Sequence, residues 1–406
     1  MKSQRLFFAA AIFAGGIILC AQTASVAELK KAVVEIGRLD FKQDIPVRYL
    51  DRPQLTKYIE QLFEKDYPEE LANRESDFLF LMGFTAEPVA LKPLRRKILL
   101  ENVGGMYNEK TKELLAVEEY REMDMLHAPA LVHELRHAIQ DQHFHLAGVL
   151  GDRSDFDDRR LAALAAIEGD ATLVMIRQLG FDPDLVGEAF NAENVLAFSA
   201  VSGASTLTAA PAVVKYQLLM PYLEGLRFSR AVLKKKNWHG LNQVLQRPPL
   251  SSEQILHPEK YFAMEKPMAV HIAYRPAAGQ LDHSGVVGEY FLNVLLADGA
   301  EAGAAALGWG GDYFALYRDG AAVMLLWEAH WDTPADGARF VAAFRAFLEK
   351  KFKFSFREGR EHGQGFLAGN SAAGYFFLYP GPGRLFYARS NERGPINELI
   401  SGGNYD

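Results

Sequence analysis

Residues 131–139 have the sequence LVHELRHAI, in which the pattern His-Glu-x-x-His lies among apolar residues. Residues four apart on a helix share a face, so His133 and His137 are placed to bind one metal ion together. Glu134 is placed to accept a proton from a water molecule held by that metal. The apolar neighbours predict a buried helix, where these polar groups need partners. The pattern therefore predicts a zinc site, and the alternative is an amphipathic helix with two hydrogen-bonded core histidines.

A third metal ligand has two candidates. His143 follows His133 by ten residues (143 − 133 = 10), the spacing at which a glycine turn brings a third histidine to the metal in metzincins. Here the glycine position is Gln140, and on a continuous helix His143 points away from the metal. Glu168 lies in the middle of residues 161–175, a very apolar stretch predicted to form a second helix. Because a buried glutamate needs a cation as partner, this stretch favours Glu168 as the third ligand.

The composition predicts a sizeable core and a division into two domains. The chain has 406 residues, of which 49% are hydrophobic, and its formal net charge is −7. Its basic runs, residues 95–97 and 234–236, are short and isolated. The charge pattern therefore argues against a nucleic-acid-binding protein, and we expect no nucleic acid among the partners.

Residues 1–27 have the pattern of an export signal. Lys2 and Arg5 form a positive start, residues 6–20 form a continuous apolar run, and residues 25–27 are small enough for a cleavage site. The apolar run is too short for a comfortable membrane span. We therefore expect a periplasmic or secreted protein without a stable membrane span after cleavage.

Cys20 is the only cysteine of the chain and lies inside the predicted signal. A lipoprotein signal needs a small residue before its cysteine, and the bulky Leu19 disfavours such an anchor here. After cleavage the chain has no cysteine, which excludes disulfides and thiol chemistry. The mature protein is thus expected to be stable without covalent cross-links.

A strand and a hairpin are predicted ahead of the histidine helix. Residues 43–50 are strand-like but contain Pro46, which places them at a sheet edge. Residues 103–117 consist of two strand-like runs around a polar turn, the pattern of a β-hairpin. A strand edge beside a zinc site can hold an extended peptide by strand addition. We hypothesise this role for residues 104–107, with a purely structural hairpin as the alternative.

The overall pattern predicts an α+β protein. Residues 28–284 are expected to form a mainly helical domain with the small sheet before the zinc helix, and residues 285–406 a smaller α+β unit. Further helices are predicted at residues 52–67, 78–82, 213–233, 238–245, 286–297 and 333–352. A turn is predicted at residues 308–312. Strands are predicted at residues 313–317, 322–331, 354–356, 374–379 and 384–389, the first two joined at Asp319-Gly320.

His133-Glu134-x-x-His137 followed by Glu168-Gly169-Asp170-Ala171 resembles the gluzincin class of zinc metallopeptidases. The strings GGMYNEKTKELLAV, HELRHAIQDQHF, EGDAT, SSEQILHPEKY, GWGGDYFALY and WDTPAD resemble a family of exported bacterial proteins over most of the mature chain. The resemblance implies a zincin-like fold and zinc bound by His133, His137 and Glu168.

The sequence departs from the thermolysin pattern at the residue that orients a zinc histidine. Thermolysin-like enzymes carry an aspartate four positions after the ligand glutamate, and that position is Thr172 here. The residues that orient the zinc histidines are therefore not implied by the resemblance. Asp141 and Asp170 are candidates for that role. Arg136 is expected to face solvent or to form a salt bridge.

An oxyanion donor is also needed for peptide hydrolysis. His257 and Tyr261 are candidates because they share one compact motif, and the alternative is a capping histidine and a packed tyrosine. Tyr107 is a second possibility.

The sequence predicts an exported zinc metallopeptidase that cleaves a peptide or protein substrate, with Glu134 as general base. The alternative is a non-catalytic exported protein that binds metal or a partner on a zincin scaffold. The intact Glu134 favours the enzyme, since a structural zinc site does not need it. A partner-binding surface around Trp309, Trp327 and Trp331 is a further possibility, although core packing is the commoner use of such residues.

Overall fold

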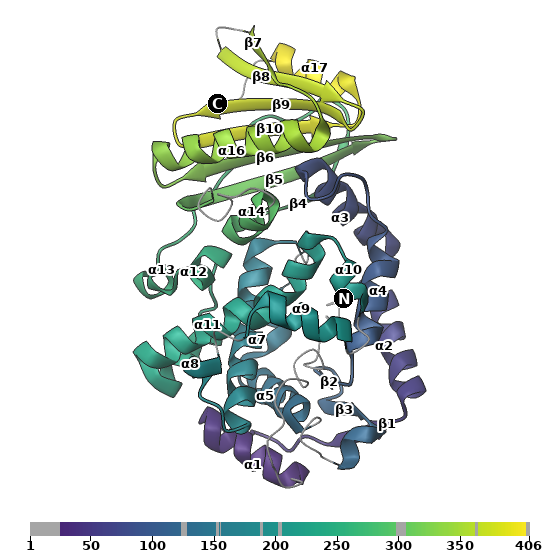
Figure 1. Ribbon diagram of the computed structural model, residues 1–406, viewed down its shortest axis with the longest axis vertical. Helices are drawn as coiled ribbons and strands as arrows, with labels where there is room; N and C mark the ends of the chain where they lie inside the picture. The colour runs from purple at the N-terminus through teal and green to yellow at the C-terminus, as the bar shows by residue number, and fades with distance from the viewer. Residues whose placement is uncertain are drawn as a thin grey trace.

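The computed structural model describes most of the chain beyond the predicted export signal. It covers residues 25–122, 128–151, 154, 156–186, 190–201, 205–297, 306–361 and 364–402. All of the signal except residues 25–27 lies outside this range. A helical part with a small sheet is followed by a part built on a seven-stranded sheet (Figure 1). The predicted α+β class is therefore confirmed. No helix in the described range is long and apolar enough to cross a membrane.

The helical part contains a three-stranded sheet and most of the helices. Its elements are α1 (Val26–Gly37), β1 (Val47–Leu50), α2 (Arg52–Asp66), α3 (Glu69–Met82), α4 (Leu91–Asn102), β2 (Gly105–Asn108), β3 (Glu113–Val117), η2 (Glu118–Glu122), α5 (Ala128–Phe144), α6 (Leu146–Leu150), α7 (Asp158–Gln178), α8 (Pro183–Val186), α9 (Ala192–Val201), α10 (Ser205–Ala209), α11 (Ala212–Gln243), η3 (Val244–Gln246), α12 (Ser252–Leu256) and α13 (Pro258–Ala263).

The small sheet confirms the two strand predictions for this part. Its order is β1-β3-β2, with β1 parallel to β3 and β2 antiparallel to β3. β1 begins directly after Pro46 and lies at one edge, so the missing proline N–H does not interrupt a ladder. β2 and β3 form the predicted hairpin, and β2 lies at the opposite edge, against α5.

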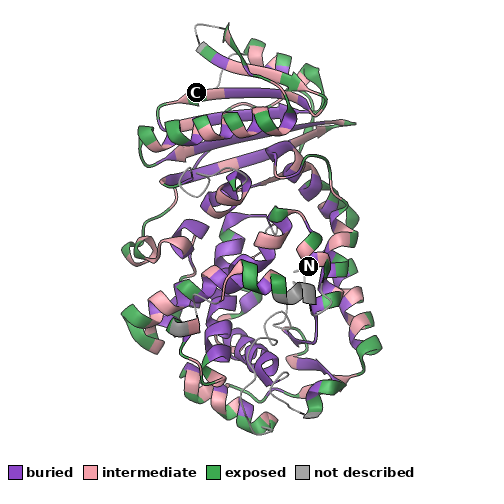
Figure 2. Ribbon diagram, viewed as in Figure 1, coloured by how far each residue is buried: buried purple, intermediate pink, exposed green. Residues whose placement is uncertain are grey.

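Three apolar helices, α5, α7 and α11, form the centre of the helical part. α5 and α7 are buried along almost their whole length, which Figure 2 shows in purple. α7 and α11 approach each other backbone to backbone at Gly169 and Gly225. A Cβ atom at Gly169 would lie 2.0 Å from the carbonyl oxygen of Gly225, and one at Gly225 would lie 2.2 Å from that of Ala165. Only glycine permits this approach, which brings the middle of α11 beside Glu168.

The C-terminal part is built on an antiparallel sheet of order β4-β5-β6-β10-β9-β8-β7. α16 packs on one face against β6 and β10, and α17 packs on the other against β9 and β10 (Figure 1). α14 lies between the sheet and α7 and α11 of the helical part. The elements are β4 (Gln280–Gly285), α14 (Gly288–Leu296), β5 (Trp309–Asp319), β6 (Ala322–Trp331), α16 (Pro334–Phe352), β7 (Arg357–Glu361), β8 (Gln364–Ser371), β9 (Gly374–Gly381), β10 (Arg384–Ser390) and α17 (Arg393–Gly402).

Most predictions for this part are confirmed, and two are wrong. Strands β5 and β6 meet at Asp319-Gly320, where Gly320 has φ of +57°. Residues 308–312, predicted as a turn, mostly belong to β5, because a bulge near Gly310 accommodates the glycines within the strand. Residues 354–356, predicted as a strand, precede β7. The predicted boundary at residue 285 falls at the end of β4, which pairs with β5.

The three tryptophans of this part lie in its core. Trp309 and Trp327 are fully buried, and Trp331 is 4% exposed. The rings of Trp327 and Trp331 pack against Phe340 of α16. Core packing is therefore their role, and they form no aromatic binding surface.

Candidate metal centre

The structure brings the three predicted metal ligands together. His133 and His137 project from one face of α5, and Glu168 projects from the facing side of α7. The Nε2 atoms of the two histidines are 2.9 Å apart, and Glu168 Oε2 lies 2.9 Å from His133 Nε2 and 3.3 Å from His137 Nε2. Ligand atoms of tetrahedral zinc, with bonds of about 2.0–2.2 Å, are about 3.3 Å apart. The cluster therefore fits a zinc ion after a small expansion.

The cluster is buried and its charges depend on one another. The histidines are fully buried and Glu168 is 1% exposed. Burial and the neighbouring His137 lower the pKa of His133. Burial disfavours the charged forms of His137 and Glu168 as well, but their mutual attraction outweighs it, so the pKa of His137 is raised and that of Glu168 is lowered. A buried carboxylate that contacts two imidazoles and no described lysine or arginine is a natural ligand for a metal cation.

Glu134 lies beside the cluster with one oxygen held and one oxygen without a partner. Its Oε2 accepts a hydrogen bond of 2.6 Å from the backbone N–H of Tyr107 in β2. Its Oε1 is buried and has no hydrogen-bond partner in the described part of the chain. Burial raises the pKa of this carboxyl to about 7. An orphaned carboxylate oxygen next to a metal centre is suited to take a proton from a water molecule.

The hairpin edge is coupled to Glu134. Residues 105–108 form β2, and the N–H of Tyr107 points away from β3 toward Glu134. Tyr107 is buried, and its hydroxyl donates to Asp141 at 2.9 Å. The role of residues 104–107 in holding a substrate stays a prediction. The Tyr107 hydroxyl was a second possible oxyanion donor, and in the structure it donates its hydrogen bond to Asp141.

The side chain that hydrogen-bonds His137 is not one of the two predicted aspartates. Asp141 accepts from Tyr107 and from the Lys112 ammonium, so its predicted contact with a zinc histidine is wrong. The described hydrogen bonds of Asp170 likewise go to Arg136 and Gln140 and not to a histidine. Asp170 binds the amide of Gln140, whose carbonyl oxygen lies 2.8 Å from His137 Nδ1. The sequence pattern missed Gln140, because an amide side chain carries no charge to mark it as a ligand partner.

Arg136 and His143 have structural contacts. Arg136 is 1% exposed and forms a two-pronged salt bridge with Asp170, so of its two predicted roles the salt bridge is found. His143 Nε2 lies 2.9 Å from the carbonyl oxygen of Asp40, away from the cluster. This position agrees with the preference for Glu168 over His143.

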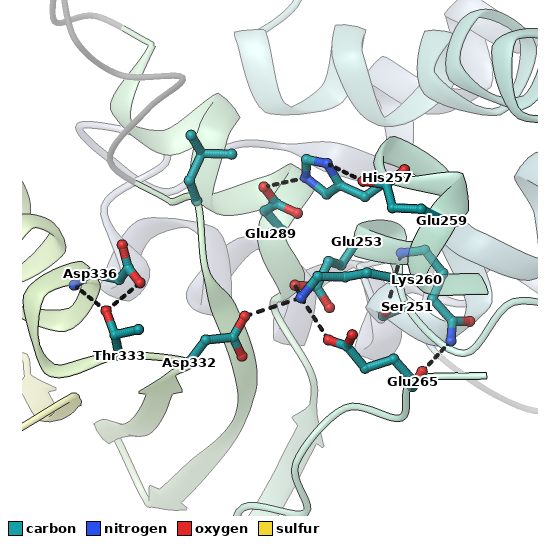
Figure 3. Close-up of polar contacts among 12 residues, drawn as sticks. Ser251, Glu253, His257, Glu259, Lys260, Glu265, Glu289, Asp332, Thr333 and Asp336 are labelled. Carbon is teal, nitrogen blue, oxygen red and sulfur yellow. Dashed lines mark hydrogen bonds and ion pairs between the residues drawn. The ribbon is translucent and has the colours of Figure 1, made fainter. Parts of the chain in front are cut away.

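His257 and Tyr261 do not reach the cluster, and their predicted place there is corrected. Figure 3 shows His257 turned toward Glu289 of α14, with an Nε2–Oε1 distance of 3.1 Å. The hydroxyl of Tyr261 donates to the carbonyl oxygen of Arg247 at 3.0 Å. α12, which directly precedes His257, packs against α7, and the N–H of Ser252 in α12 donates to Asp158 at the start of α7 at 2.9 Å.

This start of α7 is far from the ligand along the helix axis. Asp158 precedes Glu168 by ten residues (168 − 158 = 10), which corresponds to about 15 Å of helix. Sequence proximity within one motif predicted that His257 and Tyr261 project together, but it did not predict which end of α7 the motif contacts.

Tyr222 of α11 is the residue that sequence reasoning missed. Its ring centroid is 6.0 Å from that of His133, and its hydroxyl hydrogen-bonds with Glu168. The side chain is 3% exposed, and burial raises its pKa well above the usual range. A tyrosine inside an apolar helix needs a partner for its hydroxyl, which is the available signal. The partner is set by the contact of Gly169 with Gly225, because Tyr222 lies on the Gly225 face of α11.

Comparisons with known proteins identify a family only in the C-terminal part. A family model described as a domain of unknown function (DUF8575) matches residues 277–373. These residues run from β4 to the end of β8 and do not include β9 and β10. No curated protein and no solved structure matches the chain. The matched range contains none of the residues of the candidate metal centre. The function of the protein therefore has to be inferred from the geometry of that centre.

Proposed function

We propose that this protein is a zinc-dependent metallopeptidase that works outside the cytoplasm on a zincin-like helical scaffold. The observation that carries the proposal is the convergence of His133, His137 and Glu168 with Glu134 beside them. The proposed location rests on the export pattern of residues 1–27.

The donor set supports a catalytic site. Two histidines and one carboxylate are a common ligand set of zinc peptidases, and three protein ligands leave one position open. A bound zinc ion would polarise the scissile carbonyl and lower the pKa of a water molecule at that position. His133, His137 and Glu168 would hold the ion.

Glu134 supplies the proton transfer in this proposal. Its free Oε1 accepts a proton from the attacking water as the water oxygen bonds to the carbonyl carbon. The same carboxyl then gives the proton to the departing amine nitrogen as the C–N bond breaks. The N–H of Tyr107 keeps the second oxygen of Glu134 in place during both transfers.

Tyr222 is the proposed oxyanion donor in place of His257 and Tyr261. Its buried hydroxyl hydrogen-bonds Glu168 in this structure and would have to turn from Glu168 to the oxyanion, and its raised pKa keeps it protonated and able to donate. The edge of β2 is the proposed contact for the substrate backbone through its outward groups other than the Tyr107 N–H, which stays bound to Glu134, because strand addition there places a peptide next to Glu134.

The substitution Glu134→Gln tests the proposal. It removes the proton acceptor but leaves the three zinc ligands, so we expect zinc to be retained and cleavage of casein and of a peptide library to fall by about 10²–10⁴-fold. Glu35→Gln on α1, an exposed residue, is the matched control and should retain full activity. Wild-type activity in the Glu134→Gln variant would contradict the proposal.

A structural zinc site is the second candidate, and the burial of the ligands favours it. His133, His137 and Glu168 are at most 1% exposed, as expected for a closed site. In that case zinc removal would lower the melting temperature and the wild-type protein would cleave none of the peptides. The unpartnered Oε1 of Glu134 favours catalysis over this alternative.

A further inference from the structure

Gln140 of α5 has only one possible amide orientation. Its Nε2 lies 3.0 Å from the carbonyl oxygen of Ile167 and 2.8 Å from Asp170 Oδ2. A carbonyl and a carboxylate only accept hydrogen bonds, so the amide nitrogen has to face them. The amide oxygen is thereby turned toward His137, with Oε1 2.8 Å from Nδ1. The neighbours of the amide, rather than its own shape, decide which atom the histidine meets.

A buried ion pair holds this orientation in place. Asp170 is bound by the guanidinium of Arg136 through bonds of 2.8 and 3.0 Å to its two oxygens. Arg136 also donates to Asn242, at the end of α11, and to the carbonyl oxygen of Gly37 in α1. Gln140, Asp170 and Arg136 are all at most 5% exposed. The amide of Gln140 is therefore backed by contacts from four helices.

The orientation of Gln140 selects the nitrogen that His137 offers to a metal. Because Oε1 accepts, Nδ1 of His137 has to carry a hydrogen, so Nε2, which faces Glu168 and His133, is the nitrogen that could give its lone pair to a bound metal. We infer that Gln140 is a positioning residue that presents His137 to zinc through Nε2. This inference rests on the proposed zinc site and adds the residue that orients one of its ligands.

The two zinc histidines are held unequally. Nδ1 of His133 is buried and has no hydrogen-bond partner in the described part of the chain, whereas Nδ1 of His137 is bound to Gln140. The support of His137 is a neutral amide, and the charge of Asp170 acts one residue further away. Loss of Gln140 would remove the described hydrogen bond at Nδ1 of His137, so its effect on zinc affinity should be large.

The substitution Gln140→Met tests this inference in the full-length protein. It retains the length of the side chain but removes the acceptor, and we expect zinc affinity to fall about 10–100-fold in competition with a chelating dye. Gln142→Met is the matched control on the same helix. Among the described residues, the side chain of Gln142 bonds to the backbone of Lys42 and Gln43, so its loss should leave zinc affinity within about twofold of wild type.

Gln140→Glu separates positioning from a structural role. It retains an acceptor for His137 Nδ1 but places a carboxylate against Asp170, so it disturbs the network at least as much as Gln140→Met does. A positioning role predicts that zinc affinity is largely retained in Gln140→Glu. A purely structural role predicts a loss as large as in Gln140→Met, and that result would overturn the inference.

Nuclear magnetic resonance of zinc-loaded protein with ¹⁵N-labelled histidine gives a second readout. We expect a slowly exchanging Nδ1–H signal of His137 in the wild type and in Gln140→Glu, and its loss in Gln140→Met. Zinc bound through Nδ1 of His137 would overturn the inference, as would unchanged affinity in Gln140→Met. Neither readout uses peptide cleavage. A wild type that binds zinc but cleaves no peptide would therefore refute only the proposed function, and one that binds no zinc would refute both.

Discussion

In the described part of the chain, two groups of side chains each bring three possible metal-binding atoms within 4.8 Å of one another. The first is the candidate metal centre of His133, His137 and Glu168 in the helical part, called the metal centre below. The second, which we call the lysine junction, consists of Glu253, Glu265 and Asp332 around Lys260 (Figure 3). It joins the region of α12 and α13 to the end of β6.

The difference between the two groups is the cation that each one already contains. In the lysine junction, the Lys260 ammonium lies 2.7 Å from Glu253, 2.7 Å from Glu265 and 3.1 Å from Asp332. In the metal centre, the described contacts of Glu168 include no lysine or arginine. Close oxygen and nitrogen atoms are therefore not sufficient to indicate a metal. A buried acid that contacts imidazoles but no described lysine or arginine is the feature that separates the first group from the second.

The substitution with the largest expected effect removes one ligand from the metal centre. His137→Ala removes one of the three protein ligands, and we expect zinc affinity to fall by more than about 100-fold, the upper range for residues that only support a ligand. Metal analysis after dialysis should detect about one zinc per wild-type chain and almost none in the variant. Glu265→Gln in the lysine junction is the matched control and should leave the zinc content unchanged. Equal zinc content in wild type and His137→Ala would contradict the comparison.

A second substitution displaces the helix that carries Tyr222. In Gly169→Ala the new Cβ would lie 2.0 Å from the carbonyl oxygen of Gly225, so α7 and α11 have to move apart. We expect a loss of about 3 kcal/mol in the free energy of unfolding, measured by urea denaturation, and weaker zinc binding. Gly148→Ala on α6 is the control, since nothing lies within 4 Å of that Cβ position. If Gly169→Ala is as stable as Gly148→Ala, the close backbone contact is wrong.

Removal of Lys260 tests whether the lysine ammonium keeps a metal ion out of the lysine junction. Lys260→Met leaves Glu253, Glu265 and Asp332 without a cation, and we expect a loss of about 2 kcal/mol in the free energy of unfolding. Added calcium should then raise the melting temperature of this variant but not that of the wild type, because oxygen ligands without a cation suit Ca²⁺. Lys266→Met, an exposed neighbour, is the control. A calcium response in the wild type would show that Lys260 does not exclude the ion.

The smallest effect is a pH dependence beside the lysine junction. The hydrogen bond with Glu289 raises the pKa of His257, and burial of the ring opposes part of this shift. A raised folded pKa means that the stabilisation is fully present below the unfolded value of about 6.5 and is lost as the pH rises through the folded value. We expect His257→Gln to be less stable than wild type at pH 6, and we expect a smaller difference in stability at pH 9. The difference at pH 6 should be less than about 1 kcal/mol, because solvent screens the exposed side of the ring. A larger difference at pH 9 would contradict the pairing.

The elements that carry the metal centre were predictable because the information is local. The spacing of His133 and His137 places both on one helix face, and an apolar run around Glu168 predicts a second buried helix. The preference for Glu168 over His143 followed from helix geometry in the same way. None of these predictions required knowledge of how the helices pack.

The supporting residues were not predictable because they depend on contacts between helices. Tyr222 reaches Glu168 only because two glycines allow α7 and α11 to touch. Gln140 occupies the position that a glycine has in metzincins, and its role appears only when Ile167 and Asp170 of α7 are placed beside it. His257 was misplaced for the same reason, since its motif contacts the start of α7, ten residues before the ligand in the middle of that helix.

Anomalous X-ray diffraction from zinc-soaked crystals of the full chain, recorded at the zinc absorption edge, tests the central claim most directly. We expect one strong peak between His133 Nε2, His137 Nε2 and Glu168 Oε2, and no peak at the lysine junction. A peak among Glu253, Glu265 and Asp332 with none at the histidines would contradict it, as would the absence of any peak in crystals soaked at saturating zinc.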